Sequence, residues 1–73
     1  MDHFNQKERG TKTGRELKAE MVLAGVTIKK IIETINLSRV HVSNILNEKA
    51  NLTLENQKKI EEVINNEKEK NND

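Results

Sequence analysis

Cysteine is absent from the 73 residues of this chain, and so is any long apolar run. Without cysteine, disulfides and thiolate chemistry are excluded, and the composition fits a reducing compartment. No apolar run approaches the roughly 20 residues that a membrane-spanning helix needs. The opening MDHFNQKERG also lacks the apolar core of a signal peptide. We therefore expect a soluble intracellular protein.

A strong net charge is also missing. The formal net charge is +1, whereas many nucleic-acid-binding proteins are strongly basic. Residues 14–50 carry six Lys or Arg against four Glu, which gives +2, and residues 51–73 carry four Lys against six acids, which gives −2. A chain of this length makes one small domain, and its basic side coincides with its central segment.

The central segment, residues 27–47, has the apolar spacing of two short helices. Thr27 can cap the first helix. Apolar residues three and four apart form its stripe: Ile28, Ile31, Ile32 and Ile35. Asn36 follows, and asparagine tolerates the left-handed conformation that ends many helices. The chain should therefore stop and turn at this asparagine.

A second helix is predicted after Ser38, which can cap it. Leu37 should point into the core from the turn, together with the inward-facing Val42, Ile45 and Leu46. The outer face then holds donors, acceptors and one methyl-bearing side chain but no acid: Arg39, Val40, His41, Ser43, Asn44 and Asn47. Solvated helix faces usually mix both charges, so we interpret this face as one that meets another molecule. The two helices together predict a helix-turn-helix.

Supporting helices are predicted on both sides of this segment. Thr13 with Glu16 three residues later fits a capping box, so a helix should start at Gly14 and end at Gly25. Thr53 can cap a further helix. The apolar face of the first is Leu17, Met21 and Ala24, and that of the second is Ile60, Val63 and Ile64, anchored by Leu52 or Leu54.

The block LKAEMVLAGVTIKKIIETINLSRVHVSNILN, followed by LTLENQKKIEEVI, resembles the phage repressor and Cro-like (Xre-type) helix-turn-helix family. The core from Thr27 to Ile64 is also similar to the DNA-binding headpiece of lactose-repressor-type regulators. The resemblance implies an all-α, lambda-repressor-like compact bundle of four to five short helices. It also implies a sequence-specific regulator of transcription, a repressor of phage or mobile-element type, in the bacterial cytoplasm or nucleoid.

The resemblance implies roles for individual residues of the helix-turn-helix. The residues implied to contact DNA bases are Arg39, Val40, Ser43 and Asn44. Those implied to lie against phosphates are Thr27, Ile28, Lys29, Ser38, His41, Asn47 and Lys49. Side-chain chemistry agrees, because Arg can pair with guanine, Asn with adenine, Ser with several bases and Val with a thymine methyl. Lysines add attraction to phosphate that does not depend on sequence.

Two positions depart from the family pattern. Ile32 stands where a small residue is usual, so the crossing of the two helices should widen or the core should absorb the larger side chain. Asn36 stands where the turn usually has glycine, a milder change because asparagine accepts the same backbone conformation. We expect the fold to survive both departures.

The flanking segments are polar. We expect a flexible N-terminal arm over residues 1–12, the DNA-binding domain over 13–65 and a polar C-terminal tail over 66–73. Lys7, Arg9 and Lys12 in the arm could reach a phosphate backbone or a minor groove, or the arm is a plain solvated tail.

The expected partner is a double-stranded DNA operator in the form of an inverted repeat, read by a homodimer formed at least on DNA. Candidates for its interface are Leu54, Ile60, Val63 and Ile64. We expect no cofactor, small-molecule ligand, metal or enzymatic activity, because His41 has only His3 as a companion and the adjacent Glu61 and Glu62 point apart. The alternative is a protein-interaction module, such as an anti-repressor or antitoxin-like partner, on the same helical scaffold.

Overall fold

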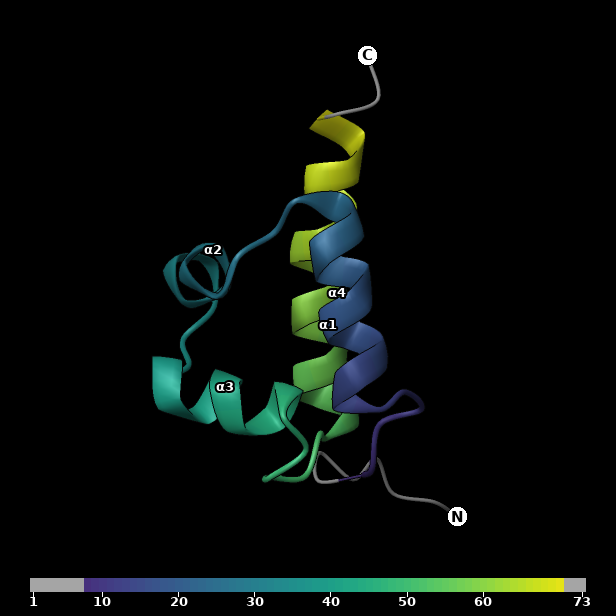
Figure 1. Cartoon of the computed structure of the whole chain (residues 1–73), viewed down its shortest axis with the longest axis vertical. Helices are drawn as coiled ribbons and strands as arrows, with labels where there is room; N and C mark the ends of the chain where they lie inside the picture. Colours follow the sequence, from purple (N-terminus) through teal and green to yellow (C-terminus); the bar gives the residue numbers. More distant parts are fainter. Residues whose placement is uncertain (1–7, 71–73) are drawn as a thin grey trace.

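The computed structural model describes residues 8–70, and within this range the chain is an all-α bundle (Figure 1). Its helices are α1 (Gly14–Ala24), α2 (Ile28–Thr34), α3 (Arg39–Leu46) and α4 (Leu54–Lys70). An isolated antiparallel bridge joins Arg9 to Thr53. The predicted fold class, a compact bundle of short helices, is therefore confirmed, with four helices in the described part of the chain.

Each of these helices begins just after a hydroxyl residue. A helix leaves the N–H groups of its first turn without a backbone partner, and the hydroxyl oxygen accepts from one of them. The four capping residues are Thr13, Thr27, Ser38 and Thr53, as the sequence predicts. At α1 the capping box is complete, because the Glu16 carboxylate also accepts from the Thr13 N–H at 2.8 Å.

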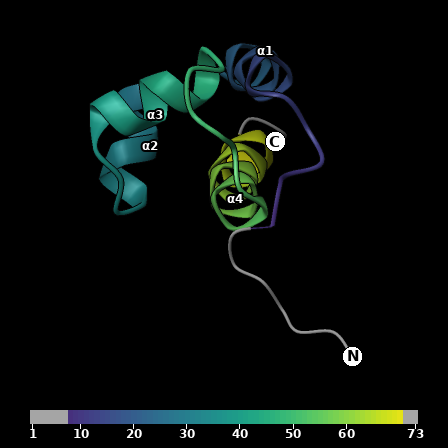
Figure 2. The same ribbon diagram turned by 90° about the horizontal axis from the view of Figure 1, so that it is seen from below.

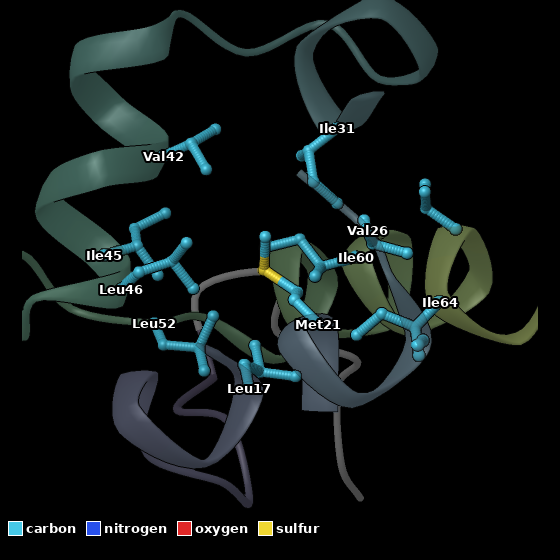
Figure 3. Packing of buried hydrophobic residues seen from close by; sticks show 12 residues of the cluster. Leu17, Met21, Val26, Ile31, Val42, Ile45, Leu46, Leu52, Ile60 and Ile64 are labelled. Atoms are coloured by element: carbon cyan, nitrogen blue, oxygen red, sulfur yellow. The ribbon is translucent and has the colours of Figure 1, made fainter. Parts of the chain in front are cut away.

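The helices are arranged in a ring around one apolar core (Figure 2). Helix α4 packs against α1 and α2, and α3 packs against the same two helices from the other side. The core residues are Leu17, Met21, Ala24, Val26, Ile31, Val42, Ile45, Leu46, Leu52, Ile60, Val63 and Ile64 (Figure 3). All the residues predicted to form the inner faces of α1, α3 and α4 belong to this set.

The turn between α2 and α3 corrects one prediction. The backbone of Ile35 is extended, with φ −118° and ψ 158°, and Asn36 is not left-handed; among the described residues only Gly25 and Glu48 have positive φ. Ile35 is half-buried against the core, and its extended backbone ends α2 and leads toward Leu37. Leu37 is also half-buried against the core, as predicted.

Ile32 lies at the rim of the core. It is partly buried and packs against the core cluster from α2, whereas Ile31 is fully buried. Part of the larger side chain therefore reaches solvent at the edge of the bundle.

The start of the described chain is hydrogen bonded to the rest of the molecule. Residues 8–13, which we call the N-terminal strap, run along the beginning of α4. The Gly10 N–H donates to the Leu52 carbonyl at 2.8 Å, and the Leu54 N–H donates to the Glu8 carbonyl at 2.6 Å. The second half of the expected N-terminal arm therefore contacts α4, while Lys7 lies outside the described residues.

The Gln57 side chain of α4 holds the strap by hydrogen bonds. Its side chain is only 3% exposed, and its Oε1 accepts from the N–H groups of Thr11 at 2.7 Å and Lys12 at 3.1 Å. Its Nε2 donates to the Thr11 hydroxyl at 2.8 Å. A Cβ at Gly10 would meet the Gln57 oxygen, so the Gln57 side chain would have to shift from its position against the strap. A buried polar side chain thereby becomes the attachment point of the strap.

Lys12 joins the strap to two helices at once. Its Nζ lies 2.7 Å from a carboxylate oxygen of Glu20 in α1 and 2.7 Å from one of Glu61 in α4. These contacts raise the pKa of Lys12, and the hydrogen bond to Glu20 is the larger cause. Lys12 is therefore engaged within the chain and is not an arm residue reaching for phosphate.

Helix α4 extends beyond the expected end of the domain and buries three of the four proposed dimer residues. It continues to Lys70, so residues 66–70 of the expected tail are helical, and residues 71–73 lie outside the described residues. Three of the proposed dimer residues are buried inside the chain itself: Ile60 is 0%, Val63 3% and Ile64 1% exposed. Leu54 is half-buried. Ile60, Val63 and Ile64 therefore complete the core of one chain and are not exposed to a second.

Candidate nucleic-acid interface

Helix α3 divides into an inner and an outer face. Val42 and Ile45 are fully buried, and Leu46 is 2% exposed. The opposite face is polar apart from Val40, which is 68% exposed. Outside the core lie Arg39, Val40, His41 and Asn47, all exposed, with Ser43 and Asn44 half-buried. None of these six side chains is acidic.

The four residues predicted to contact bases are brought together on this outer face. Arg39 and Ser43 are four apart on α3, as are Val40 and Asn44, so the two pairs form adjacent rows along the helix. Among the described residues, no side chain hydrogen bonds to Arg39 or to the Asn44 amide. Their donors and acceptors therefore point to solvent and are available for another molecule.

The outer face of α3 also carries one exposed apolar side chain, Val40. In the described part of the chain three large apolar side chains are exposed, namely Val22, Leu23 and Val40. Val40 is the one among them that lies on α3, flanked by Arg39 and Asn44. A methyl-bearing side chain between hydrogen-bonding groups is the combination that can contact a base edge with a methyl group.

The residues predicted to contact phosphate differ in which of their groups are free to bind an anion. At the start of α2, Thr27 is exposed, but its hydroxyl accepts from the Lys30 N–H at 3.2 Å. Ile28 is half-buried against the core, so only its main-chain N–H is free to meet an anion from outside. Lys29 is fully available as an exposed cation.

The remaining phosphate candidates lie on α3 and just beyond it. Ser38 is exposed, and its hydroxyl caps the helix by accepting from the His41 N–H at 3.1 Å. The Asn47 Nδ2 donates to the Ser43 hydroxyl at 3.3 Å, which orients both side chains on the outer face. Lys49 follows in the connection to α4 and is exposed. Hydroxyl, amide and ammonium groups therefore border α3 at both ends.

One acid follows α3 directly. The Glu48 carboxylate accepts from the Arg15 main-chain N–H in the first turn of α1, at 3.2 Å. Glu48 lies in the connection between α3 and α4, and the residue spacing did not indicate its contact with α1. The signal that could have indicated it is weak: the residues 47–51, NEKAN, follow the helix without any glycine to end it.

The rest of the described chain shows neither a metal centre nor a membrane span. No cluster of three or more His, Asp or Glu side chains within residues 8–70 could hold a metal ion. Across the same residues, every helix is too short or too polar to traverse a bilayer.

Comparison with protein-family models, with curated proteins and with solved structures finds no match to this chain.

Proposed function

We propose that this chain binds double-stranded DNA sequence-specifically and regulates transcription, with α3 lying in the major groove. The observation that carries the proposal is the outer face of α3, which is exposed, free of acids and rich in hydrogen-bonding groups. The resemblance of residues 14–65 to Xre-type repressors supports the same reading. An α-helix fits the width of the major groove, where the four base pairs present distinct patterns of donors and acceptors.

Each base-contacting candidate has a chemically defined target. The Arg39 guanidinium can donate two hydrogen bonds to one guanine, and the Asn44 amide can pair with adenine through a donor and an acceptor. Val40 would contact the C5-methyl group of thymine, and Ser43 adapts to several bases. The expected half-site therefore contains both a G·C pair and A·T pairs.

Phosphate contacts would hold α3 in register without reading sequence. Lys29 at the start of α2 and Lys49 beyond α3 supply the positive charge, and His41, Ser38, Thr27 and Asn47 supply further donors, with the Ile28 N–H. A net charge of +1 is then sufficient, because residues 14–50 carry six Lys or Arg against four Glu, whereas α4 carries five Glu against four Lys. Arg9 is exposed on the strap and could add one more contact.

The regulator we propose acts as a repressor of the phage or mobile-element type and binds an inverted repeat as a homodimer. One recognition helix of eight residues reads few base pairs, so a specific site needs two of them about one DNA turn apart. The dimer contact would have to use surface residues other than Ile60, Val63 and Ile64, which are buried.

A second function is favoured by a different surface. Val22 is 71% and Leu23 86% exposed, and they are consecutive residues of α1. Exposed apolar side chains of this kind commonly mark protein interfaces. A protein-interaction module, such as an anti-repressor or antitoxin-like partner, would use such a surface, and its binding would not require DNA.

Selection of bound duplexes from a random pool tests the proposal, at about 150 mM salt so that non-specific phosphate binding is suppressed. We expect enrichment of an inverted repeat whose half-site spacing corresponds to one or more helical turns. Absence of any enriched sequence, from protein shown by circular dichroism to be helical, would contradict DNA recognition and favour the protein partner.

A further inference from the structure

The same backbone motif ends both α1 and α3. In each, one residue adopts a left-handed conformation and two N–H groups bond back to carbonyls of the last turn. At α1 the left-handed residue is Gly25, with φ 75°. At α3 it is Glu48, with φ 63°. At α1 the Gly25 N–H donates to the Val22 carbonyl at 3.1 Å, and the Val26 N–H donates to the Met21 carbonyl at 2.8 Å. At α3 the Glu48 N–H donates to the Ile45 carbonyl at 3.1 Å, and the Lys49 N–H donates to the Asn44 carbonyl at 2.7 Å.

The two left-handed residues differ in how well they suit this conformation. Glycine adopts it without steric penalty, whereas a side chain with a Cβ is disfavoured there. Glu48 is the one non-glycine residue with positive φ in the part of the chain that the structure describes. A disfavoured backbone conformation persists when the surroundings hold it, and it often marks a functional position.

The Glu48 side chain reaches from the end of α3 to the start of α1. Its Oε2 accepts from the Arg15 N–H at 3.2 Å. That N–H belongs to the first turn of α1, where backbone donors lack helical partners and negative charge is favourable. A glycine at this position would fit the backbone better but would leave the contact between the two helices unmade.

The backbones of the two helices also touch at this point. Gly14 is buried, and a Cβ on it would collide with the Ile45 carbonyl oxygen in the last turn of α3. Figure 2 shows the end of α3 beside α1. The other end of α3 is joined to α2 by the short connection through Leu37. The Glu48 contact and the close approach at Gly14 therefore both lie where the C-terminal end of α3 meets the start of α1.

We propose that Glu48 is a positioning residue for DNA recognition: its carboxylate fixes the direction of α3 relative to α1, at the expense of a strained backbone. This inference rests on the proposed function, since it assigns Glu48 to the discrimination of sequence by α3. A helix that tilts freely can still be held by phosphates, but its side chains no longer meet the base edges in one register. Loss of the contact should therefore lower specificity more than it lowers general affinity.

Glu48→Gly separates positioning from stability. Glycine relieves the left-handed backbone, so we expect the midpoint of thermal unfolding to stay the same or rise. The ratio of affinity for the selected site to affinity for a scrambled duplex should fall about tenfold, comparable to the loss of one base-pair contact. Glu48→Gln keeps an oxygen that can accept from the Arg15 N–H, so it should retain more of this ratio than Glu48→Gly does.

Removing an acid near DNA raises non-specific binding by itself, so a matched control is needed. Glu33→Gln removes one negative charge from the exposed surface of α2, and Glu33 makes no side-chain hydrogen bond or ion pair with any residue that the structure describes. This variant should keep the wild-type ratio. A ratio for Glu48→Gly equal to that of Glu33→Gln would overturn the proposal.

A measurement without DNA completes the test. Residual dipolar couplings of the backbone N–H groups report the direction of α3 relative to α1. We expect the wild type and Glu33→Gln to share one direction and Glu48→Gly to show a changed or averaged one. Unchanged couplings in Glu48→Gly would refute the positioning role. If the wild type selects no DNA sequence, the proposed function and the specificity role of Glu48 both fail, and the couplings alone decide whether Glu48 orients α3.

Discussion

The Gln57 side chain in α4 accepts a hydrogen bond from the main-chain N–H of Thr11 at 2.7 Å, so it joins residues that are 46 positions apart. The same oxygen accepts from the Lys12 N–H, and the amide nitrogen donates to the Thr11 hydroxyl. A single side chain therefore satisfies three polar groups of the strap. The bonds of Glu8 to Leu54 and of Gly10 to Leu52 and the ion pair of Lys12 with Glu61 connect the same two parts of the chain.

Gln57→Leu should destabilise the fold by about 1–3 kcal/mol, because the N–H groups of Thr11 and Lys12 lose their acceptor in a part-buried site. Urea denaturation followed by circular dichroism measures this change. Lys58→Gln, at the exposed neighbouring position, is the control and should stay within about 0.5 kcal/mol of the wild type. A Gln57→Leu protein as stable as this control would show that the strap adds little.

Lys12 should make stability depend on alkaline pH. Its pKa in the folded chain is raised above the ordinary value of 10.5 by Glu20 and Glu61, so the folded state binds the proton more tightly than the unfolded state. The contribution of Lys12 is then fully present below its unfolded pKa and is lost as pH rises through its higher folded pKa. The difference in unfolding free energy between the wild type and Lys12→Gln should be constant near neutral pH and shrink above about pH 10.5.

Urea titrations of both proteins at several pH values test this dependence. Lys58→Gln controls for the titration of lysines in general, because Lys58 is exposed and forms no ion pair with the described residues. A difference between the wild type and Lys12→Gln that persists unchanged through the alkaline range would contradict the role assigned to the ammonium group.

Arg39 and Lys29 should affect DNA binding in different ways. Arg39→Ala removes a base-edge contact, so it should cost about 1–3 kcal/mol at the selected site and relax the preference at one base pair. Lys29→Ala removes a phosphate contact, so it should weaken binding to all sequences alike and reduce the slope of log affinity against log salt by about 1. Titrations of both variants against the selected and a scrambled duplex, at several salt concentrations, distinguish the two. If both variants behaved as the wild type, α3 would not be the DNA-binding element.

In Gly14→Ala, helix propensity and packing should change the stability of the protein in opposite directions. Alanine favours a helix by roughly 1 kcal/mol over glycine, so propensity alone predicts a more stable protein. The added Cβ would meet the Ile45 carbonyl oxygen, which belongs to the backbone and cannot move without shifting α3. Overpacking costs about 1–3 kcal/mol, so we expect a net loss of stability. Thermal unfolding measures the sign, with Arg15→Ala in the same turn as an exposed control.

The parts of the fold that sequence predicts are those that local chemistry determines. Thr13, Thr27, Ser38 and Thr53 each cap a helix because a hydroxyl before an apolar repeat satisfies a backbone donor wherever it occurs. The inner and outer faces of α3 follow from residue spacing in the same way. The positions of the candidate interface residues could therefore be predicted, whereas the identity of the molecule they contact is a proposal.

The parts that sequence reasoning missed depend on contacts between distant segments. Nothing near Gln57 indicates that it will accept bonds from the strap, because its partners are more than 40 residues away. Asn36 was predicted from propensity to end α2 in the left-handed conformation, but α2 ends at an extended Ile35. The left-handed conformation of Glu48, at the end of α3, was not predicted, and there the Arg15 N–H supplies a partner for its side chain. The dimer residues were misjudged because spacing shows that a face is apolar and does not show which chain covers it.

The hydrogen bonds between the strap and α4 also bear on how a newly synthesised chain can fold. Translation produces the strap first and Gln57 much later, so the amides of Thr11 and Lys12 have no permanent partner while α1, α2 and α3 are already exposed to the cell. A chain that ends before α4 lacks Gln57, so the strap and the adjoining start of α1, on which α3 rests, should be held less firmly. The surface we propose for DNA then depends on a helix that contributes no residue to it.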